Sequence, residues 1–327
     1  MNNKINIAII THKNCDGDAV MSTLSLAETL PNILNDKKIN VIPIIEKHKL
    51  PFEHKSKLKY YTLDEVNDKQ IDYIIVCDVN EQDRVYGIDI FNKVPIEKRF
   101  LIDHHDRNRQ ELEVLSQNKF INPKSCSTCE IIASFLLNKK HKISNDIMYN
   151  LYLGMASDTF CFQRSVTSDS LRIANILVSD KQERNNIKDK LLKMNLEQEK
   201  LYKLIKENKR FEKDGIRMFN LSVPIEMGDI TKLLKHPSFD SLTAPIESCP
   251  ISIFIIEIEN NYFIKFKKID NCDIDILKLA IACNGGGHSN RCAGRFYNTS
   301  YDEVIKKIIN EYGNITKGKL KIKQLSV

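Results

Sequence analysis

The sequence predicts an α/β protein in two parts, an N-terminal doubly wound parallel sheet joined by a helical linker to a smaller α/β C-terminal domain. Apolar, β-branched segments alternate with helical patterns along the first part. A highly charged stretch follows, and strand-like patterns return after it. The length of 327 residues also favours two domains over one core. We expect a catalytic domain at 1–185, a linker at 186–211 and a substrate-binding domain at 212–327.

Four apolar segments in the first hundred residues are predicted to be buried strands. They are Ile5–Ile10, Val41–Ile45, Tyr73–Val76 and Phe100–Ile102. Helical spacing predicts a helix over Ala19–Leu30 that ends at Pro31. Further helices are expected at Thr128–Leu137, Asp146–Met155 and Ser168–Val178. Ligands of such sheets bind at the carboxyl ends of the strands, so polar residues that follow each strand are candidates for function.

The second half begins with the charged stretch from Asp180 to Lys213, whose apolar residues keep helical spacing. It predicts one or two surface or linker helices. The strands expected beyond it are Met218–Val223, Ile251–Ile258 and Tyr262–Phe266, the last two joined as a hairpin by residues 259–261. A helix over Ile274–Cys283 then leads into a glycine-rich segment.

Composition indicates a soluble, cytoplasmic protein without a membrane association. No apolar run reaches the roughly 18 to 20 residues that span a bilayer, and Met1–Ile10 lacks the features of a secretory signal. The nine cysteines are expected to be reduced thiols. The net charge is +6, and part of the excess is in the tail at Lys317, Lys319, Lys321 and Lys323. Those lysines form either a solvated face or a surface that attracts a polyanion such as a short oligonucleotide.

Carboxylates and imidazoles follow three of the four predicted strands. They are His12, Asp16 and Asp18 after the first, Asp78 after the third, and Asp103, His104 and His105 at the end of the fourth. Asp158 follows a predicted helix. Each motif alone is typical of a loop or a helix cap. Gathered at one edge of a sheet, the carboxylates would repel one another without a cation, so together they predict a metal site.

In this order the motifs resemble the four motifs of the DHH phosphoesterase superfamily. Gly285-Gly286-Gly287-His288 is similar to the glycine-rich loop of the DHH-associated C-terminal domain. The size and this loop most resemble the nanoRNase/pAp phosphatase group and its relatives that cleave cyclic dinucleotides or their linear products. The resemblance covers nearly the whole chain.

The resemblance implies two divalent metal ions, with manganese the usual ion. One would be held by His12, Asp16 and Asp78, and the other by Asp18, Asp78, His104 and Asp158. It also implies that His105 faces the scissile phosphate and that Asp103 supports a histidine. The implied substrate-binding residues are Gly285, Gly286, Gly287, His288 and Arg291.

The implied reaction is hydrolysis of short single-stranded oligoribonucleotides (nanoRNA) and of 3′-phosphoadenosine 5′-phosphate (pAp). The alternatives are cleavage of cyclic di-AMP or of its linear dinucleotide pApA and, from a different class, a non-catalytic nucleic-acid-binding module. The cleavage polarity and the oligomeric state, a homodimer included, stay open.

Some residues depart from the superfamily pattern and leave the substrate open. Phe160 stands where glycine is usual, and the strand segment Lys265–Lys268 stands where an arginine is usual. Arg164, Ser165 and Thr167 either line the cleft or form a polar loop before the helix expected at Ser168–Val178. Cys126 and Cys129 have a zinc-knuckle spacing, but no second Cys or His pair follows, so we expect no structural zinc.

Overall fold

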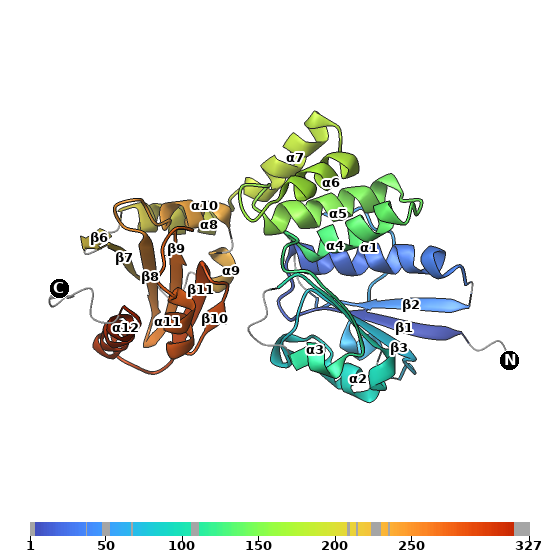
Figure 1. Ribbon diagram of the computed structural model, residues 1–327, viewed down its shortest axis with the longest axis horizontal. Helices are drawn as coiled ribbons and strands as arrows, with labels where there is room; N and C mark the ends of the chain where they lie inside the picture. Colours follow the sequence, from blue (N-terminus) through green and yellow to red (C-terminus); the bar gives the residue numbers. More distant parts are fainter. Residues whose placement is uncertain are drawn as a thin grey trace. The chain divides into compact units, whose positions relative to one another are not determined.

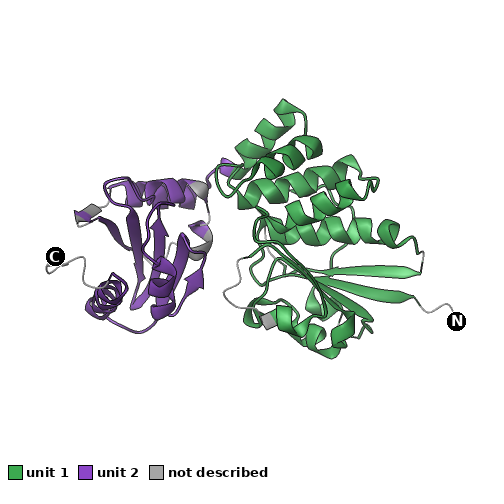
Figure 2. Cartoon of the chain, in the orientation of Figure 1, with its two compact units in different colours: residues 1–191 green, residues 192–327 purple. Residues whose placement is uncertain are grey.

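The computed structural model describes residues 4–316, apart from 37, 48–52, 67, 106–110, 208–209, 214, 224–229 and 235. The chain divides into two compact units, residues 1–191 and 192–327 (Figure 2). The predicted architecture, a parallel N-terminal sheet and a second α/β domain, is confirmed. No helix in the described part of the chain is long and apolar enough to cross a membrane. The lysines of the predicted basic tail lie outside the described residues.

Unit 1 contains a five-stranded parallel sheet in the order β2-β1-β3-β4-β5. The strands are β1 (Ile5–Ile10), β2 (Ile39–Ile44), β3 (Tyr73–Cys77), β4 (Arg99–Asp103) and β5 (Asn118–Ile121). Strand β5 was not predicted, because this short edge strand is polar and its one aromatic residue, Phe120, is exposed. The strand order reverses between β1 and β3, and ligands of open α/β sheets bind at such a switch point.

Helices cover both faces of this sheet (Figure 1). One face carries α1 (Gly17–Leu34), α4 (Thr128–Asn138), α5 (Asn145–Asp158), α6 (Ser168–Leu177) and α7 (Lys181–Leu192). The other carries α2 (Ile88–Lys93) and α3 (Glu111–Leu115), with short 3-10 turns at Leu63–Glu65, Gln82–Arg84 and Ile96–Lys98. Alternate residues of β1 enter different cores, since Ile7 and Ile9 pack with the first group whereas Ala8 and Ile10 pack with the second. The sheet is therefore doubly wound, as predicted.

Helix α1 begins directly after the loop that follows β1. Asp16 caps its first turn by accepting a hydrogen bond from the Ala19 N–H at 3.2 Å. The prediction that this helix ends at Pro31 is wrong, because the helix continues to Leu34 with Pro31 inside it. Proline removes one helical N–H donor, and α1 ends within the next turn, at Asn35 in the left-handed conformation.

Unit 2 contains a six-stranded sheet in the order β10-β11-β9-β8-β7-β6. The strands are β6 (Arg210–Lys213), β7 (Ile216–Ser222), β8 (Ile251–Ile258), β9 (Asn261–Lys268), β10 (Gly286–Gly287) and β11 (Arg291–Phe296). Only the β7–β8 pair is parallel among these strands. The predicted β8–β9 hairpin is confirmed, with Ile258 opposite Asn261.

Two helical layers cover the sheet of unit 2 as well. Phe254 and Ile256 pack against α8 (Leu196–Glu207), α9 (Ile230–Leu233) and α10 (Pro237–Leu242). Ile253 and Ile255 face the opposite side, with α11 (Ile276–Ala282) and α12 (Tyr301–Ile315).

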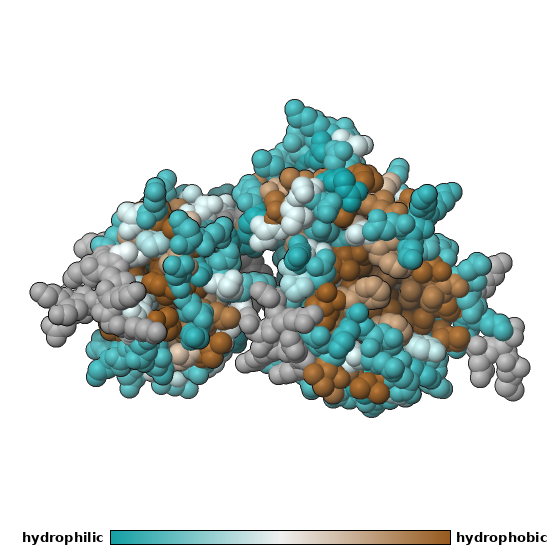
Figure 3. Space-filling view, viewed as in Figure 1, coloured by the Kyte–Doolittle hydropathy of each residue, from teal (hydrophilic) through white to brown (hydrophobic). Residues whose placement is uncertain are grey.

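The charged stretch in the middle of the chain forms α7 and α8, and the two helices pack on different cores. Ile187 of α7 is buried in the core of unit 1. Leu201 and Ile205 of α8 are buried in unit 2. The outer surface formed by α7, at the top of Figure 3, is hydrophilic. The charges of this stretch therefore face solvent while a few apolar side chains anchor each helix.

Candidate active site

The predicted carboxylates and histidines of unit 1 come together at the carboxyl ends of β1, β3 and β4. His12, Asp78 and His104 follow these strands, and Asp103 is the last residue of β4. Asp16 and Asp18 lie at the start of α1, and Asp158 is the last residue of α5. Among the residues that the structure describes, three groups have potential ligand atoms within 4.8 Å of one another. They are His12/Asp16/Asp78, Asp18/His104/Asp158 and Asp78/His104/His105.

Asp78 lies at the centre of the cluster. Its Oδ2 is 3.7 Å from His12 Nε2, and its Oδ1 is 3.5 Å from His104 Nε2. The side chain is only 3% exposed. The residue has a φ of 64°, in the left-handed region that side-chain-bearing residues rarely adopt. Asp78 thus turns one carboxylate oxygen toward each of two histidines.

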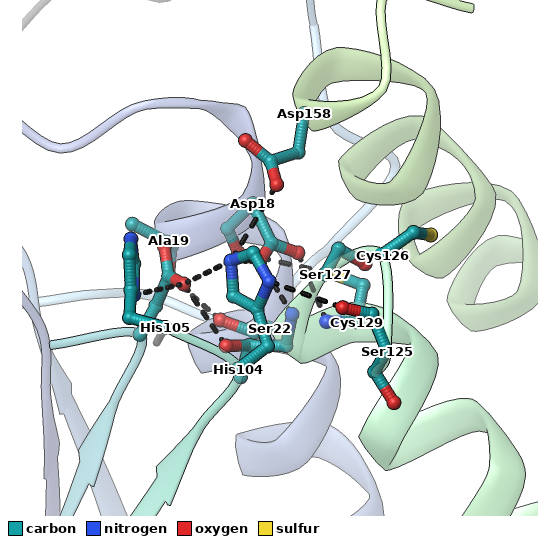
Figure 4. Close-up of polar contacts among 12 residues, drawn as sticks. Asp18, Ala19, Ser22, His104, His105, Ser125, Cys126, Ser127, Cys129 and Asp158 are labelled. Atoms are coloured by element: carbon teal, nitrogen blue, oxygen red, sulfur yellow. Dashed lines mark hydrogen bonds and ion pairs between the residues drawn. The ribbon is translucent and has the colours of Figure 1, made fainter. Parts of the chain in front are cut away.

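Backbone carbonyls orient both of these histidines. His12 Nδ1 is 2.8 Å from the Lys13 carbonyl, and His104 Nδ1 is 3.3 Å from that of Ser125. A carbonyl oxygen can only accept, so each Nδ1 is the donor and carries a proton. In the neutral ring, Nε2 then keeps its lone pair and faces the carboxylates. Figure 4 shows His104 between Asp158 and Ser125 in this arrangement.

The N-terminus of α4 holds Asp18 in place. The N–H groups of Thr128 and Cys129 donate to the two Asp18 oxygens at 2.6 and 2.9 Å, and the Thr128 hydroxyl donates to Asp78 Oδ1 at 2.9 Å. The positive end of the helix favours this carboxylate. Ser127 caps α4 by accepting a hydrogen bond from the Glu130 N–H. The contacts of Thr128 were missed, because nothing in the local sequence connects it to residues 50 and 110 positions away.

The negative charge gathered here exceeds what the protein itself balances. Burial, and then the carboxylates of Asp18, Asp16, Asp103 and Asp158, raise the pKa of Asp78 well above its ordinary value. Burial likewise raises the pKa of Asp158 to about 6, although His104 opposes the shift. A divalent cation would supply the missing positive charge.

The spacing of the polar atoms also suits a metal ion. Histidine nitrogens and carboxylate oxygens are separated by 3.4 to 3.9 Å around His12 and His104. Such separations are compatible with ligands that share one ion through bonds of about 2.0 to 2.2 Å. The donor set of imidazole nitrogens and carboxylate oxygens fits manganese, iron, zinc or cobalt.

His105 lies beside this cluster and is held by Asp103. Its Nδ1 donates to Asp103 Oδ1 at 2.7 Å, and Asp103 is fully buried whereas the His105 side chain is 30% exposed. Burial alone would lower the pKa of His105, but the bond to Asp103 outweighs it and the pKa is raised. The same bond overcomes burial at Asp103 and lowers the pKa of that carboxyl. The pair is therefore an oriented proton donor with a buried anion behind it.

The glycine-rich segment belongs to unit 2 and forms the turn into β10. A Cβ on Gly285 would lie 1.8 Å from the Ala293 carbonyl oxygen, so only glycine fits there. The N–H groups of Gly285 and His288 donate to the carbonyls of Ala280 and Arg291, at 2.9 and 2.7 Å. These two amides are thus used within the protein, and Gly286 and Gly287 pair with β11.

Arg291 shares a carboxylate with a buried lysine, a contact that the sequence did not predict. Asp240 on α10 accepts from Arg291 Nη1 at 2.9 Å and from Lys267 Nζ at 2.7 Å. Lys267 is 6% exposed and also donates to the Thr243 hydroxyl at 2.9 Å. Burial lowers the pKa of Lys267 to about 8, although Asp240 opposes the shift. Arg291 and Lys267 stand opposite each other on β11 and β9.

Comparison with known proteins supports this architecture. Residues 6–155 match the DHH family, N-terminal domain. The chain is 24% identical over 310 residues to the probable bifunctional oligoribonuclease and PAP phosphatase NrnA of Streptococcus mutans serotype c, covering 91% of this chain and 92% of that protein.

The fold is also similar to a solved structure. An exopolyphosphatase-related protein from Bacteroides fragilis superimposes with a TM-score of 0.72 at 21% identity, over 95% of this chain and 92% of that one. This likeness covers both units and shows the fold. Residues 6–155, which match the DHH family, N-terminal domain, contain the strand-end histidines and all but one of the clustered aspartates.

Proposed function

We propose that this protein is a metal-dependent phosphoesterase that hydrolyses short oligoribonucleotides and pAp. The observation that carries the proposal is the Asp78 carboxylate, whose two oxygens face the histidines of two different His/Asp groups. The similarity to a probable oligoribonuclease and PAP phosphatase over most of both chains supports the substrate class.

The proposed ligand sets follow the clusters of unit 1. His12, Asp16 and Asp78 would hold one divalent ion. Asp18, His104 and Asp158, with the second oxygen of Asp78, would hold the other. When bound, two such ions, with manganese the expected one, would lower the pKa of a bound water and neutralise phosphate oxygens.

The remaining residues of the site serve binding and proton transfer. His105, oriented by Asp103 at 2.7 Å, would donate to the phosphate or to its leaving oxygen, since its raised pKa keeps it protonated nearer to neutral pH. In unit 2 we assign the side chains of His288 and Arg291, with the turn at Gly285–Gly287, to a further phosphate of the substrate. The boundaries 1–185, 186–211 and 212–327 are proposed for the catalytic, linker and substrate-binding parts.

A product analysis tests the proposal. The full chain is incubated with manganese and diribonucleotides, longer oligoribonucleotides, pAp, cyclic di-AMP and pApA, and the products are separated by chromatography. We expect turnover of the short oligoribonucleotides and of pAp, loss of turnover in EDTA, and recovery on adding manganese. Binding of RNA without turnover of any of these compounds would instead indicate a nucleic-acid-binding module, and preference for cyclic di-AMP or pApA would change the substrate assignment.

A further inference from the structure

The segment that follows Asp158 has an unusual backbone. Phe160, Cys161 and Phe162 have φ values of 51°, 56° and 63°, so three consecutive residues with side chains adopt the left-handed conformation. Such a conformation is unfavourable for every residue except glycine. Strain of this kind persists where the surroundings enforce it, and it is concentrated at functional sites.

Specific contacts tie this left-handed turn, residues 160–162, to α5 and to the core. The Cys161 N–H donates to the Ala156 carbonyl at 2.7 Å. The buried Thr159 hydroxyl accepts from the Phe162 N–H at 2.9 Å and donates to the Met155 carbonyl at 2.7 Å. The Phe162 ring packs on Tyr152 with centroids 5.2 Å apart. The turn is therefore a built part of the fold.

The left-handed turn brings Arg164 back toward the end of α5. The Arg164 N–H donates to the Thr159 carbonyl at 3.2 Å, which closes the turn. The guanidinium carbon lies 3.3 Å from the centre of the Phe160 ring, a cation–π contact. Nε and Nη2 each lie 3.4 Å from the carbonyl oxygen of Asp158. A fixed cation thus stands beside the backbone of a residue whose carboxylate is 3.4 Å from His104.

The position of Arg164 matters because both the carboxylates of the site and a phosphate ester are negatively charged. A cation beside the site would offset their repulsion. The aspartates gathered around His12 and His104 would repel the negative charge of a phosphate. A guanidinium presents its donors in a planar fork that matches phosphate oxygens. We propose that Arg164, positioned by Phe160 and the left-handed turn, binds a non-bridging oxygen of the phosphate that reacts at the metal centre. The inference rests on the proposed function.

The matched pair Arg164→Gln and Arg172→Gln tests the inference. Arg172 is an exposed arginine of the same unit, on α6, that pairs with Asp169 at 3.2 Å. With manganese and the diribonucleotide ApA, whose product AMP keeps the phosphate that reacts, we expect Arg164→Gln to lower kcat/KM by about 10- to 100-fold, the loss of one charge-assisted hydrogen bond. Its affinity for AMP, measured by calorimetry in manganese, should fall as well. Arg172→Gln should match the wild type, and Arg164→Lys should fall between because it keeps the charge and loses the fork.

Two further measurements separate phosphate binding from structural support of Asp158. A residue that only holds Asp158 would, when replaced, weaken manganese binding and lower the melting temperature together with activity. That result, or an Arg164→Gln variant equal to Arg172→Gln, would overturn the inference. Manganese affinity and melting temperature close to the wild type, with weaker AMP binding, support it.

Phe160 offers an independent check on the positioning role. Phe160→Tyr keeps the aromatic face and should keep activity, whereas Phe160→Leu should lower kcat/KM in the same direction as Arg164→Gln. Equal activity of the two variants would contradict the role of the ring. If the wild type turns over no nucleotide, the proposed function fails, but AMP affinity in Arg164→Gln against Arg172→Gln still decides whether Arg164 binds phosphate.

Discussion

Replacing Asp78 by asparagine tests the metal centre most directly. The carboxylate faces His12 with one oxygen and His104 with the other, at 3.7 and 3.5 Å. Asparagine keeps the shape but loses the charge and one of the two oxygens. We therefore expect Asp78→Asn to lose both metal ions and to lower kcat by more than about 100-fold, since even supporting residues around a metal typically cost 10- to 100-fold.

The magnitude of the thermal effect follows from linkage. An ion that binds only the folded state, at 100 times its dissociation constant, adds about 2.7 kcal/mol to stability. For a unit of 191 residues, each 1 kcal/mol shifts the melting temperature by about 2 to 4 °C. Manganese should thus raise the melting temperature of the wild type by about 5 to 11 °C per ion, and most of this shift should vanish in Asp78→Asn.

Without metal, Asp78→Asn should not lower the melting temperature. Burial and four neighbouring carboxylates disfavour the Asp78 charge, so a neutral asparagine should leave the melting temperature in EDTA unchanged or raise it. Differential scanning fluorimetry in EDTA and in manganese, together with turnover of pAp, measures all three effects. Asp169→Asn, an exposed carboxylate on α6, serves as the control. A variant that keeps both the manganese shift and turnover would refute the assignment.

Three further changes test other parts of the structure. Asp103→Asn should lower kcat by about 10- to 100-fold while keeping the manganese-induced shift, because it weakens the support of His105 and leaves the ligands in place; loss of that shift would contradict the supporting role. Gly285→Ala should destabilise unit 2 in urea unfolding, because the new Cβ would meet the Ala293 carbonyl; an unchanged midpoint would argue against it. The pKa of Lys267 is about 8 when folded, below its ordinary 10.5. Between these values the unfolded chain binds more protons, so stability should rise with pH across that window by up to about 1.4 kcal/mol per pH unit. Lys267→Met should flatten this rise, as urea unfolding at pH 8 and 10 will show.

The strand ends were predictable because their signal is local. A carboxylate or histidine directly after a buried apolar run can be read from sequence, and parallel strands deliver such residues to one edge. Asp78 and Asp103–His105 were found in this way. Thr128 was not, since its hydrogen bond to Asp78 depends on how α4 packs against the sheet. Asp240 was missed for the same reason, because its contacts join α10 to β9 and β11.

The helices and strands, too, were predictable where the sequence signal is local and were missed where it depends on packing. Long apolar strands and amphipathic helices were predicted, whereas β5 was missed because a short edge strand buries little and carries a weak pattern. The end of α1 was predicted wrongly because proline disfavours a helix interior, yet the helix continues past Pro31 to Leu34. Leu30 is the last buried residue of α1, and Ile33, beyond Pro31, packs partly buried against the core of unit 1.

The aspartates of the site differ in how firmly they are held. Asp18 and Asp78 are 1% and 3% exposed, and α4 fixes both of them. Asp16 and Asp158 are 43% and 31% exposed. Asp18 and Asp78 therefore form the buried part of the site, and Asp16 and Asp158 form its solvent-exposed edge. An ion arriving from solvent would meet the two more exposed carboxylates, Asp16 and Asp158, before the pair that α4 holds. We therefore expect ion exchange to begin at Asp16 and Asp158, while Asp18 and Asp78 keep their positions.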